Sequence, residues 1–142
     1  MPDAPARELV LFRVAGRIHG IDLHTIREVI PARRTTRLPG APDFVAGLMN
    51  VRGTIVTVID LGAHLASAPV GSGAQVVLVE EGAKLVGIAV DEVLEVRRLD
   101  ASQVEPAPPE QTEGGVVAGL GHSGDSVVIL LDIRAIIQHV LL

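Results

Sequence analysis

Short apolar runs rich in β-branched residues alternate along the chain with glycine, proline and charged residues. Runs of this length, bounded by turn residues, predict strands rather than helices. Turns are expected at Ala15-Gly16 and at Arg52-Gly53, where glycine allows tight backbone geometry. The expected strands are 8–15, 17–21, 35–38, 47–52, 54–60, 76–80, 84–90, 93–98, 116–121 and 126–131.

Two segments have the apolar spacing of a helix. The first is 22–30, where Asp22 is a suitable N-cap and one face of the helix is apolar. Pro31 disfavours helical geometry at the residue before it, so this helix is expected to end there. The second is a closing helix over 132–141, with Asp132 as its cap. The apolar face of the first helix consists of Leu23, Ile26 and Ile30.

The chain also repeats itself. Residues 45–61 read VAGLMNVRGTIVTVIDL and align without a gap, at an offset of 72, with VAGLGHSGDSVVILLDI at 117–133. A second match, at an offset of 67, joins 11–21 to 78–88. Two matches in the same order indicate two copies of a unit of roughly 65–70 residues.

The repeat and the many short strands predict a mainly β fold with two small barrels, because closed barrels leave no free sheet edges. We expect one domain over 1–142, with barrel one at about 8–65 and barrel two at about 76–131. The stretch 66–75 is the expected linker, and the helix over 132–141 closes the fold. Two barrels side by side would form a groove between them.

Composition and charge limit the kinds of core, cellular location and partner that this chain can have. Apolar residues make up 48% of the chain, and Phe12 and Phe44 are its two aromatic residues, so the core must consist of Val, Ile, Leu and Ala. The absence of cysteine favours a reducing cytoplasm, and no apolar run is long enough to span a membrane. The net charge of −5 argues against nucleic acid. Arg33, Arg34 and Arg37 form the nearest thing to a basic cluster, which we interpret as a solvated loop.

No catalytic constellation is visible in the sequence. The five histidines do not have metal-ligand spacing, and no phosphate-binding glycine loop or nucleophile elbow is present. Asp60 and Asp132 occupy equivalent repeat positions, and each is expected to cap the segment after a long strand. The chain is therefore interpreted as a binding protein without catalytic residues, metal or cofactor. The histidines are His19, His24, His64, His122 and His139.

The segment from Phe44 to Leu61 resembles the signature of the CheW family of bacterial chemotaxis coupling proteins. The family pattern has Gly, two variable positions, Asn-Leu-Arg-Gly, and an apolar strand ending in Asp-Leu. Val51 replaces the leucine. Further similarity lies in Gly20–Leu23, in 85–91 and in 118–121, so that the resemblance covers roughly 8–140. The matching signature residues are Gly47, Asn50, Arg52, Gly53, Asp60 and Leu61, and Ile26, Glu28 and Val29 also fit.

This resemblance implies two intertwined five-stranded barrels and a non-catalytic adaptor. Such an adaptor links the cytoplasmic tip of a chemoreceptor to the regulatory domain of a CheA-type histidine kinase, which has the same fold and can alternate with it in rings. It implies a cytoplasmic location at the membrane-associated receptor array, with no nucleic acid and no direct membrane insertion. The alternatives are a small-ligand-binding β-barrel protein and a regulatory module of another sensory pathway.

Arg52 is the residue whose role is least obvious, since it lies within the most apolar segment. Gly124 replaces it in the second repeat, so a hairpin turn alone does not require an arginine. It could form a salt bridge with Glu28 or Asp22, or contact a partner, and the two roles are compatible. We expect a receptor helix to lie in the groove between the barrels. The expected receptor-binding residues are Ile26, Glu28, Arg52 and Val77, and the expected kinase-binding residues are Gly47, Asn50 and Gly53.

Overall fold

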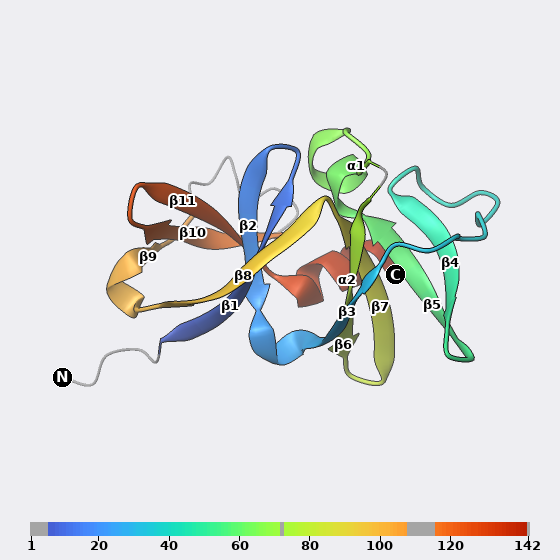
Figure 1. Cartoon of the computed structure of the whole chain (residues 1–142), viewed down its shortest axis with the longest axis horizontal. Helices are drawn as coiled ribbons and strands as arrows, with labels where there is room; N and C mark the ends of the chain where they lie inside the picture. The colour runs from blue at the N-terminus through green and yellow to red at the C-terminus, as the bar shows by residue number, and fades with distance from the viewer. Residues whose placement is uncertain (1–5, 72, 108–115, 142) are drawn as a thin grey trace.

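The computed structural model describes residues 6–71, 73–107 and 116–141. Two twisted β-sheets lie side by side, and two short helices pack where the sheets meet (Figure 1). The strands are β1 Arg7–Val14, β2 Arg17–Asp22, β3 Ile26–Pro31, β4 Val45–Val51, β5 Thr54–Asp60, β6 Gln75–Glu81, β7 Lys84–Val90, β8 Glu92–Leu99, β9 Val104–Glu105, β10 Val117–Ser123 and β11 Ser126–Leu131. The helices are α1 Leu61–Ala66 and α2 Ile133–Leu141, with short 3-10 turns at Leu23–Thr25 and Ala101–Gln103.

The mainly β fold is confirmed, but the sheets are open rather than closed. Sheet A has six strands in the order β8-β1-β2-β11-β10-β9, and sheet B has five in the order β3-β6-β7-β5-β4. In the part of the chain that the structure describes, no backbone ladder joins β3 to β4 or β8 to β9. The expectation of closed barrels is therefore corrected to two sheets that each keep two edges.

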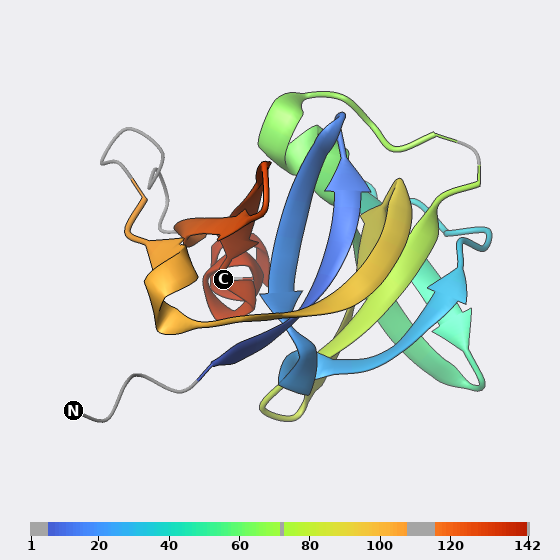
Figure 2. The ribbon, with the colours of Figure 1, turned by 60° about the vertical axis from the view of Figure 1, so that its left-hand side comes forward.

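The two sheets do not correspond to the two sequence halves. The expected division at 66–75 would keep β1 and β2 with β3–β5, whereas β1 and β2 belong to the same sheet as β8–β11. Figure 2 shows the blue β1–β2 hairpin between the gold β8 and the red β10–β11 hairpin. Each sheet therefore combines the first hairpin of one repeat with the later strands of the other repeat, so the two repeats are intertwined.

The internal duplication is borne out by strand register. β5 runs parallel to β7 with Thr57 opposite Val86, and β11 runs parallel to β2 with Ile129 opposite His19. Shifting the first pair by the two sequence offsets, 72 and 67, gives the second pair. The β4–β5 and β10–β11 hairpins also carry their β-bulge at the same repeat position. Residues 45–61 and 117–133 are therefore topologically equivalent.

Both aspartates that follow the long strands cap helices, as expected. The Asp60 carboxylate accepts a hydrogen bond from the Ala63 amide at 3.0 Å, and the Asp132 carboxylate accepts one from the Ala135 amide at 3.1 Å. These contacts satisfy amides that have no partner within the helix. The helix α1 was not expected from sequence, although its cap is the repeat equivalent of the cap of α2.

The helix predicted over 22–30 is wrong. Asp22 does accept a hydrogen bond from the His24 amide, at 2.8 Å, but the turn that it caps ends at Thr25. From Ile26 onward the chain is the edge strand β3, paired antiparallel with β6. Backbone pairing with β6 and the β-branched residues of this segment outweigh its helical spacing. The expected strand over 35–38 is reduced to one isolated bridge between Thr36 and Leu48.

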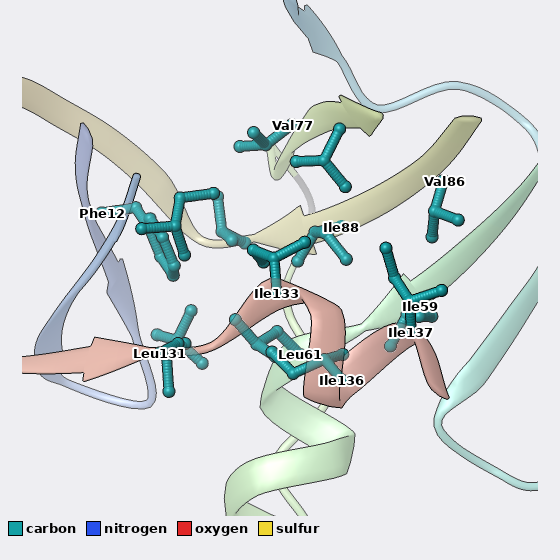
Figure 3. Packing of buried hydrophobic residues seen from close by; sticks show 14 of the residues in the cluster. Phe12, Ile59, Leu61, Val77, Val86, Ile88, Leu131, Ile133, Ile136 and Ile137 are labelled. Carbon is teal, nitrogen blue, oxygen red and sulfur yellow. The ribbon is translucent and has the colours of Figure 1, made fainter. Parts of the chain in front are cut away.

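The hydrophobic core has three parts. One cluster lies within the curve of sheet A and one within the curve of sheet B, and the third and largest joins the two sheets and both helices (Figure 3). On β6, Val76 and Leu78 face the core of sheet B, while Val77 and Val79 face the shared cluster. Central strands such as β6 are therefore buried on both faces. The residues labelled in Figure 3 are Phe12, Ile59, Leu61, Val77, Val86, Ile88, Leu131, Ile133, Ile136 and Ile137.

His19 is the buried polar side chain among the described residues, with 5% of its surface exposed. Its ring stacks on Phe12 with centroids 5.9 Å apart, and its Nδ1 lies 3.2 Å from the Arg17 carbonyl oxygen. Burial lowers the pKa of His19 below its ordinary value of 6.5, against the opposing effect of the Arg17 carbonyl. The folded protein therefore holds this imidazole neutral where the unfolded chain would protonate it.

We expect this burial to make the folded state less stable as the pH falls below 6.5, the ordinary pKa of histidine. The unfolded chain then binds a proton that the folded chain does not, which costs at most about 1.4 kcal/mol per pH unit. Urea unfolding at about pH 7.5 and about pH 5.5 measures the loss, since these values bracket the titration. His19→Leu should reduce the loss, whereas the exposed His24→Leu should not. Equal losses in the two variants would refute the assignment.

Candidate functional site

Arg52 lies at the tip of the β4–β5 hairpin. Arg52 has φ +49° and Gly53 has φ +87°, so both central residues of this two-residue turn are left-handed, as a type I′ turn requires. The turn expected at Arg52-Gly53 is thereby confirmed. The Asn50 side-chain oxygen accepts a hydrogen bond from the Gly53 amide at 2.9 Å. The Asn-x-Arg-Gly motif therefore builds a rigid turn that holds the arginine outward.

The Arg52 guanidinium forms an ion pair with Glu28. Its Nη1 lies 3.5 Å from Glu28 Oε2, and its Nη2 donates to Glu28 Oε1. Glu28 belongs to β3 and Arg52 to the β4–β5 turn, which are at the two open edges of sheet B. The ion pair thus connects two edges that backbone hydrogen bonds leave apart. Of the two carboxylates considered from sequence, Glu28 is the partner, since Asp22 caps the turn at Leu23–Thr25.

The ion pair is accessible to solvent. Its side chains are 64% exposed at Arg52 and 31% exposed at Glu28. The hydrogen bond from Arg52 lowers the pKa of Glu28 against the opposing effect of burial, and the charges of Arg52, Arg27 and Arg33 lower it further by smaller amounts. The same contact raises the pKa of Arg52. An exposed pair of this kind adds little to the free energy of unfolding. Because its side chains reach the solvent, a partner could contact them.

Sheet A has a corresponding contact, but its arginine lies on β8, the repeat equivalent of β3, and not at the hairpin tip. Glu95 on β8 is the repeat equivalent of Glu28, and it pairs with Arg97 at 2.7 Å. Arg97 also donates to the Ser123 hydroxyl at the end of β10. A side-chain bridge therefore joins β8 to β10 just as Arg52 joins the β4–β5 turn to β3. This explains how the second repeat can have Gly124 at the hairpin tip.

The exposed large hydrophobic residues follow the same symmetry. Val29 and Val96 are equivalent at an offset of 67, and Ile55 and Val127 are equivalent at an offset of 72. Their exposed fractions are 37%, 55%, 59% and 50%, respectively. Val29 is the chain neighbour of Glu28, and Ile55 lies three residues after Arg52. The strands next to the ion pair therefore also carry exposed apolar side chains, and Val29 points to the face of β3 opposite Glu28.

An open recess of about 430 Å³ lies beside the ion pair. It is bounded by β3, by the β4–β5 turn and by the β6–β7 turn, and half of its lining residues are charged. Arg27 spans this end as well, pairing with Glu80 on β6. A charged and open recess suits the polar rim of a protein contact better than an enclosed apolar ligand. The charged lining residues are Arg27, Glu28, Arg52, Glu80 and Lys84.

The structure brings only part of the expected site together. Glu28 and Arg52 are in contact, and Ile26 is half-buried on β3 against the shared core cluster. Val77 has no exposed surface, so it cannot line a groove and is corrected to a core residue. Val29 and Ile55 were not assigned to the site from sequence. The sequence of β3, IREVIP, does not alternate between apolar and polar residues, so it carried no signal that Val29 is exposed.

The three residues expected to bind a kinase all shape the backbone of the same hairpin. Asn50 and Gly53 form its turn. Gly47 has φ +141°, and a Cβ atom built on it would lie 2.3 Å from the Thr36 backbone oxygen. Thr36 and Leu48 exchange two backbone hydrogen bonds of 2.8 Å at this point. Gly47 is therefore required for the close approach of the β3–β4 connection to β4.

The described residues provide neither a metal site nor a membrane-spanning helix. Among residues 6–71, 73–107 and 116–141, no group of three or more histidine, aspartate or glutamate side chains is arranged to hold a metal ion. None of the helices in these ranges has the length and apolar character needed to cross a bilayer.

Comparison with known proteins shows which family this chain is similar to in sequence and in structure. A family model described as the CheW-like domain matches residues 8–141. The chemotaxis protein CheW of Klebsiella aerogenes is 33% identical over 136 residues, covering 93% of this chain and 82% of that protein. CheW of Treponema pallidum is 31% identical over 136 residues, covering 89% and 79%. The crystal structure of the scaffolding protein TtCheW from Thermoanaerobacter tengcongensis superposes with a TM-score of 0.82 at 29% identity, covering 90% of each chain.

Proposed function

Because the chain belongs to the CheW family, whose members are non-catalytic scaffolding proteins of chemotaxis, we propose that it is an adaptor that couples a chemoreceptor to a CheA-type histidine kinase. The proposed partners are the cytoplasmic tip of the receptor and the regulatory domain of the kinase. The adaptor would act in the cytoplasm, at a membrane-associated receptor array.

One observation supports this function most directly. The Arg52–Glu28 pair is exposed at the end of sheet B, beside an open recess that several charged side chains line. A fixed guanidinium offers several donors in a planar fork, which suits polar atoms on a partner helix. Arginine is also one of the residue types enriched at interaction hot spots.

We assign the receptor contact to Glu28 and Arg52, with Ile26 contributing its exposed part. The kinase contact is assigned to the hairpin that Gly47, Asn50 and Gly53 shape. In this assignment the glycines act through the backbone conformation that they permit. The two partners would then engage neighbouring surfaces of sheet B, which allows one molecule to hold both.

The proposal predicts direct binding to each partner without turnover of a substrate. Calorimetric titration against the kinase regulatory domain and against a soluble receptor-tip fragment measures the two affinities. Binding to both domains is the expected result. Failure to bind either domain, together with saturable binding of a small metabolite, would replace the adaptor by a ligand-binding protein.

A further inference from the structure

An apolar recess of about 410 Å³ lies at the end of α1. It is bounded by α1, by the β1–β2 hairpin and by β10 and β11, which Figure 2 shows close together. Seven of its nine lining residues are apolar, among them Leu65, Val117 and Ile129. The other two are Arg17 and His19, which are two residues apart on β2 and so point to the same face of the strand. A largely apolar recess with a few placed polar groups has the composition of a small-molecule site.

His19 is the polar side chain that reaches this recess from the interior. It is 5% exposed, and its Nδ1 lies 3.2 Å from the Arg17 carbonyl oxygen. Its Nε2 has no hydrogen-bond partner among the described residues. In that part of the chain no fully buried side-chain nitrogen or oxygen lacks a partner, so Nε2 must be open to the recess that His19 lines.

The tautomer of His19 decides what its Nε2 can bind. A carbonyl oxygen only accepts hydrogen bonds, so the contact with Arg17 requires the proton to be on Nδ1. Burial lowers the pKa of His19, which keeps the other ring nitrogen unprotonated. Nε2 is therefore an acceptor, and a ligand in the recess has to supply an O–H or N–H donor at this point.

The equivalent place in the other sheet is closed. Val86 is the repeat equivalent of His19, and Ile137 is the repeat equivalent of Leu65. Val86 and Ile137 are 1% and 3% exposed, and they lie with Ile59 in the shared cluster (Figure 3). The helix α1 has six residues, whereas α2 has nine and continues three residues beyond the equivalent point. The fold thus fills this place with apolar side chains in sheet B, but leaves it open beside an imidazole in sheet A.

Arg17 can hold an anionic group at the mouth of the recess. It is exposed, and its guanidinium makes no hydrogen bond or ion pair with any of the described residues. Residues two apart on a strand are about 7 Å apart along the chain. A benzene ring with substituents at opposite ends carries its two polar groups at a similar spacing, so one small molecule can engage both Arg17 and His19.

We propose that this recess binds a small aromatic acid, with its ring against the apolar walls, a hydroxyl group donating to His19 Nε2 and its carboxylate paired with Arg17. The site goes beyond the adaptor function and does not depend on it. It shares no lining residue with the recess beside the Arg52–Glu28 pair.

The experiment is an amide NMR titration of the isotope-labelled full-length chain with para-hydroxyphenylacetate. Two analogues are matched controls, since phenylacetate lacks the hydroxyl group and para-hydroxyphenylacetamide lacks the charge. His19→Leu removes the acceptor, Arg17→Gln removes the cation, and the exposed His24→Leu is the control variant. The comparison of the three ligands on the wild-type protein remains informative even if His19→Leu does not fold, which circular dichroism would show.

We expect saturable shifts at the residues that line the recess. Phenylacetate should bind at least about tenfold more weakly, because it leaves the buried acceptor of His19 unpaired. His19→Leu should lose a similar factor for para-hydroxyphenylacetate. The uncharged analogue and Arg17→Gln should each lose about threefold, since Arg17 is exposed to solvent. His24→Leu should bind as the wild-type protein does.

Three results would overturn the inference. They are equal affinities for para-hydroxyphenylacetate and phenylacetate, shifts that lie outside the recess, and no shift up to about 10 mM ligand. Displacement of the bound acid by the receptor-tip fragment or by the kinase regulatory domain would assign the recess to a protein side chain and also contradict it. The titration itself contains no partner, so its failure leaves the adaptor function intact, and failure of both partner domains to bind leaves the ligand site intact.

Discussion

Replacing Gly47 by alanine is expected to lower the free energy of unfolding by about 3 kcal/mol. Two causes act together. The backbone at Gly47 has φ +141°, which L residues rarely adopt, and the added Cβ would lie 2.3 Å from the Thr36 backbone oxygen. Because that oxygen accepts the Leu48 amide in a bridge, relieving the clash would also weaken the link between the β3–β4 connection and β4.

Gly53→Ala is the matched control for this variant. Gly53 also has a positive φ, +87°, but nothing lies within 4 Å of the position that its Cβ would occupy. The control should therefore cost only the conformational term, about 1 kcal/mol. Urea unfolding monitored by far-UV circular dichroism measures both variants. If Gly47→Ala is no less stable than Gly53→Ala, the close approach at Thr36 is not what requires glycine.

The second large effect is on binding. Arg52→Ala should weaken affinity for the receptor tip by about thirtyfold or more, because an arginine held at a rigid turn is a typical hot-spot residue. Its urea midpoint should change little, since the Arg52–Glu28 pair is exposed to solvent. Calorimetry against the receptor-tip fragment and urea unfolding of the same protein sample give the two quantities. The binding loss should exceed the stability loss.

Two further variants make this result interpretable. Arg52→Lys keeps the charge but loses the planar fork, so it should restore affinity only in part. Arg97→Ala removes the corresponding bridge of sheet A and should leave receptor affinity close to wild type. A clear drop in the urea midpoint of Arg52→Ala with unchanged receptor affinity would make Arg52 a structural brace that holds the two edges of sheet B together.

The apolar pattern was sufficient to predict most strands, both hairpin turns and the duplication, because these depend on local residue choice. It failed at 22–30, where the spacing of apolar residues is that of a helix. Ile26 and Ile30 would lie on one face of a helix, whereas the register shift between Ile26 and Glu28 sends them to opposite sides of β3. Ile26 packs against the shared cluster, and Ile30 belongs to the core of sheet B. Pairing with β6, a non-local contact, decided between helix and strand. The helix α1 was missed although Asp60 repeats the capping role of Asp132.

The division into two sheets could not be read from the repeat. A duplicated unit can pair its strands within each copy or exchange them between copies, and the local sequence is the same in both cases. The exchange of the first hairpins also explains why Val77 is buried. In sheet B, β6 lies between β3 and β7, and its Val77 face packs in the cluster shared by the two sheets. The run Val76–Val79 is continuously apolar rather than alternating, which indicates a strand covered on both faces. That signal favoured the core, where the structure places Val77.

The role of Arg52 was predictable in part. Its absence from the second repeat indicated a purpose beyond the turn, and Glu28 was one of two carboxylates considered as its partner. The bridge between the open edges of sheet B could not be anticipated, because closed barrels would have no edges to connect. The corresponding bridge in sheet A, from Arg97 to Ser123, could not be anticipated either, because it joins β8 to β10, which are far apart in the sequence.

The most direct test of the adaptor function is a bridging measurement. Membranes containing the chemoreceptor are sedimented with the kinase regulatory domain, with and without this protein, and the kinase domain in the pellet is quantified. We predict that the kinase domain sediments well above background only when the protein is present, and that Arg52→Ala abolishes most of this increase. Equal amounts of kinase domain in the pellet with and without the protein would contradict the account.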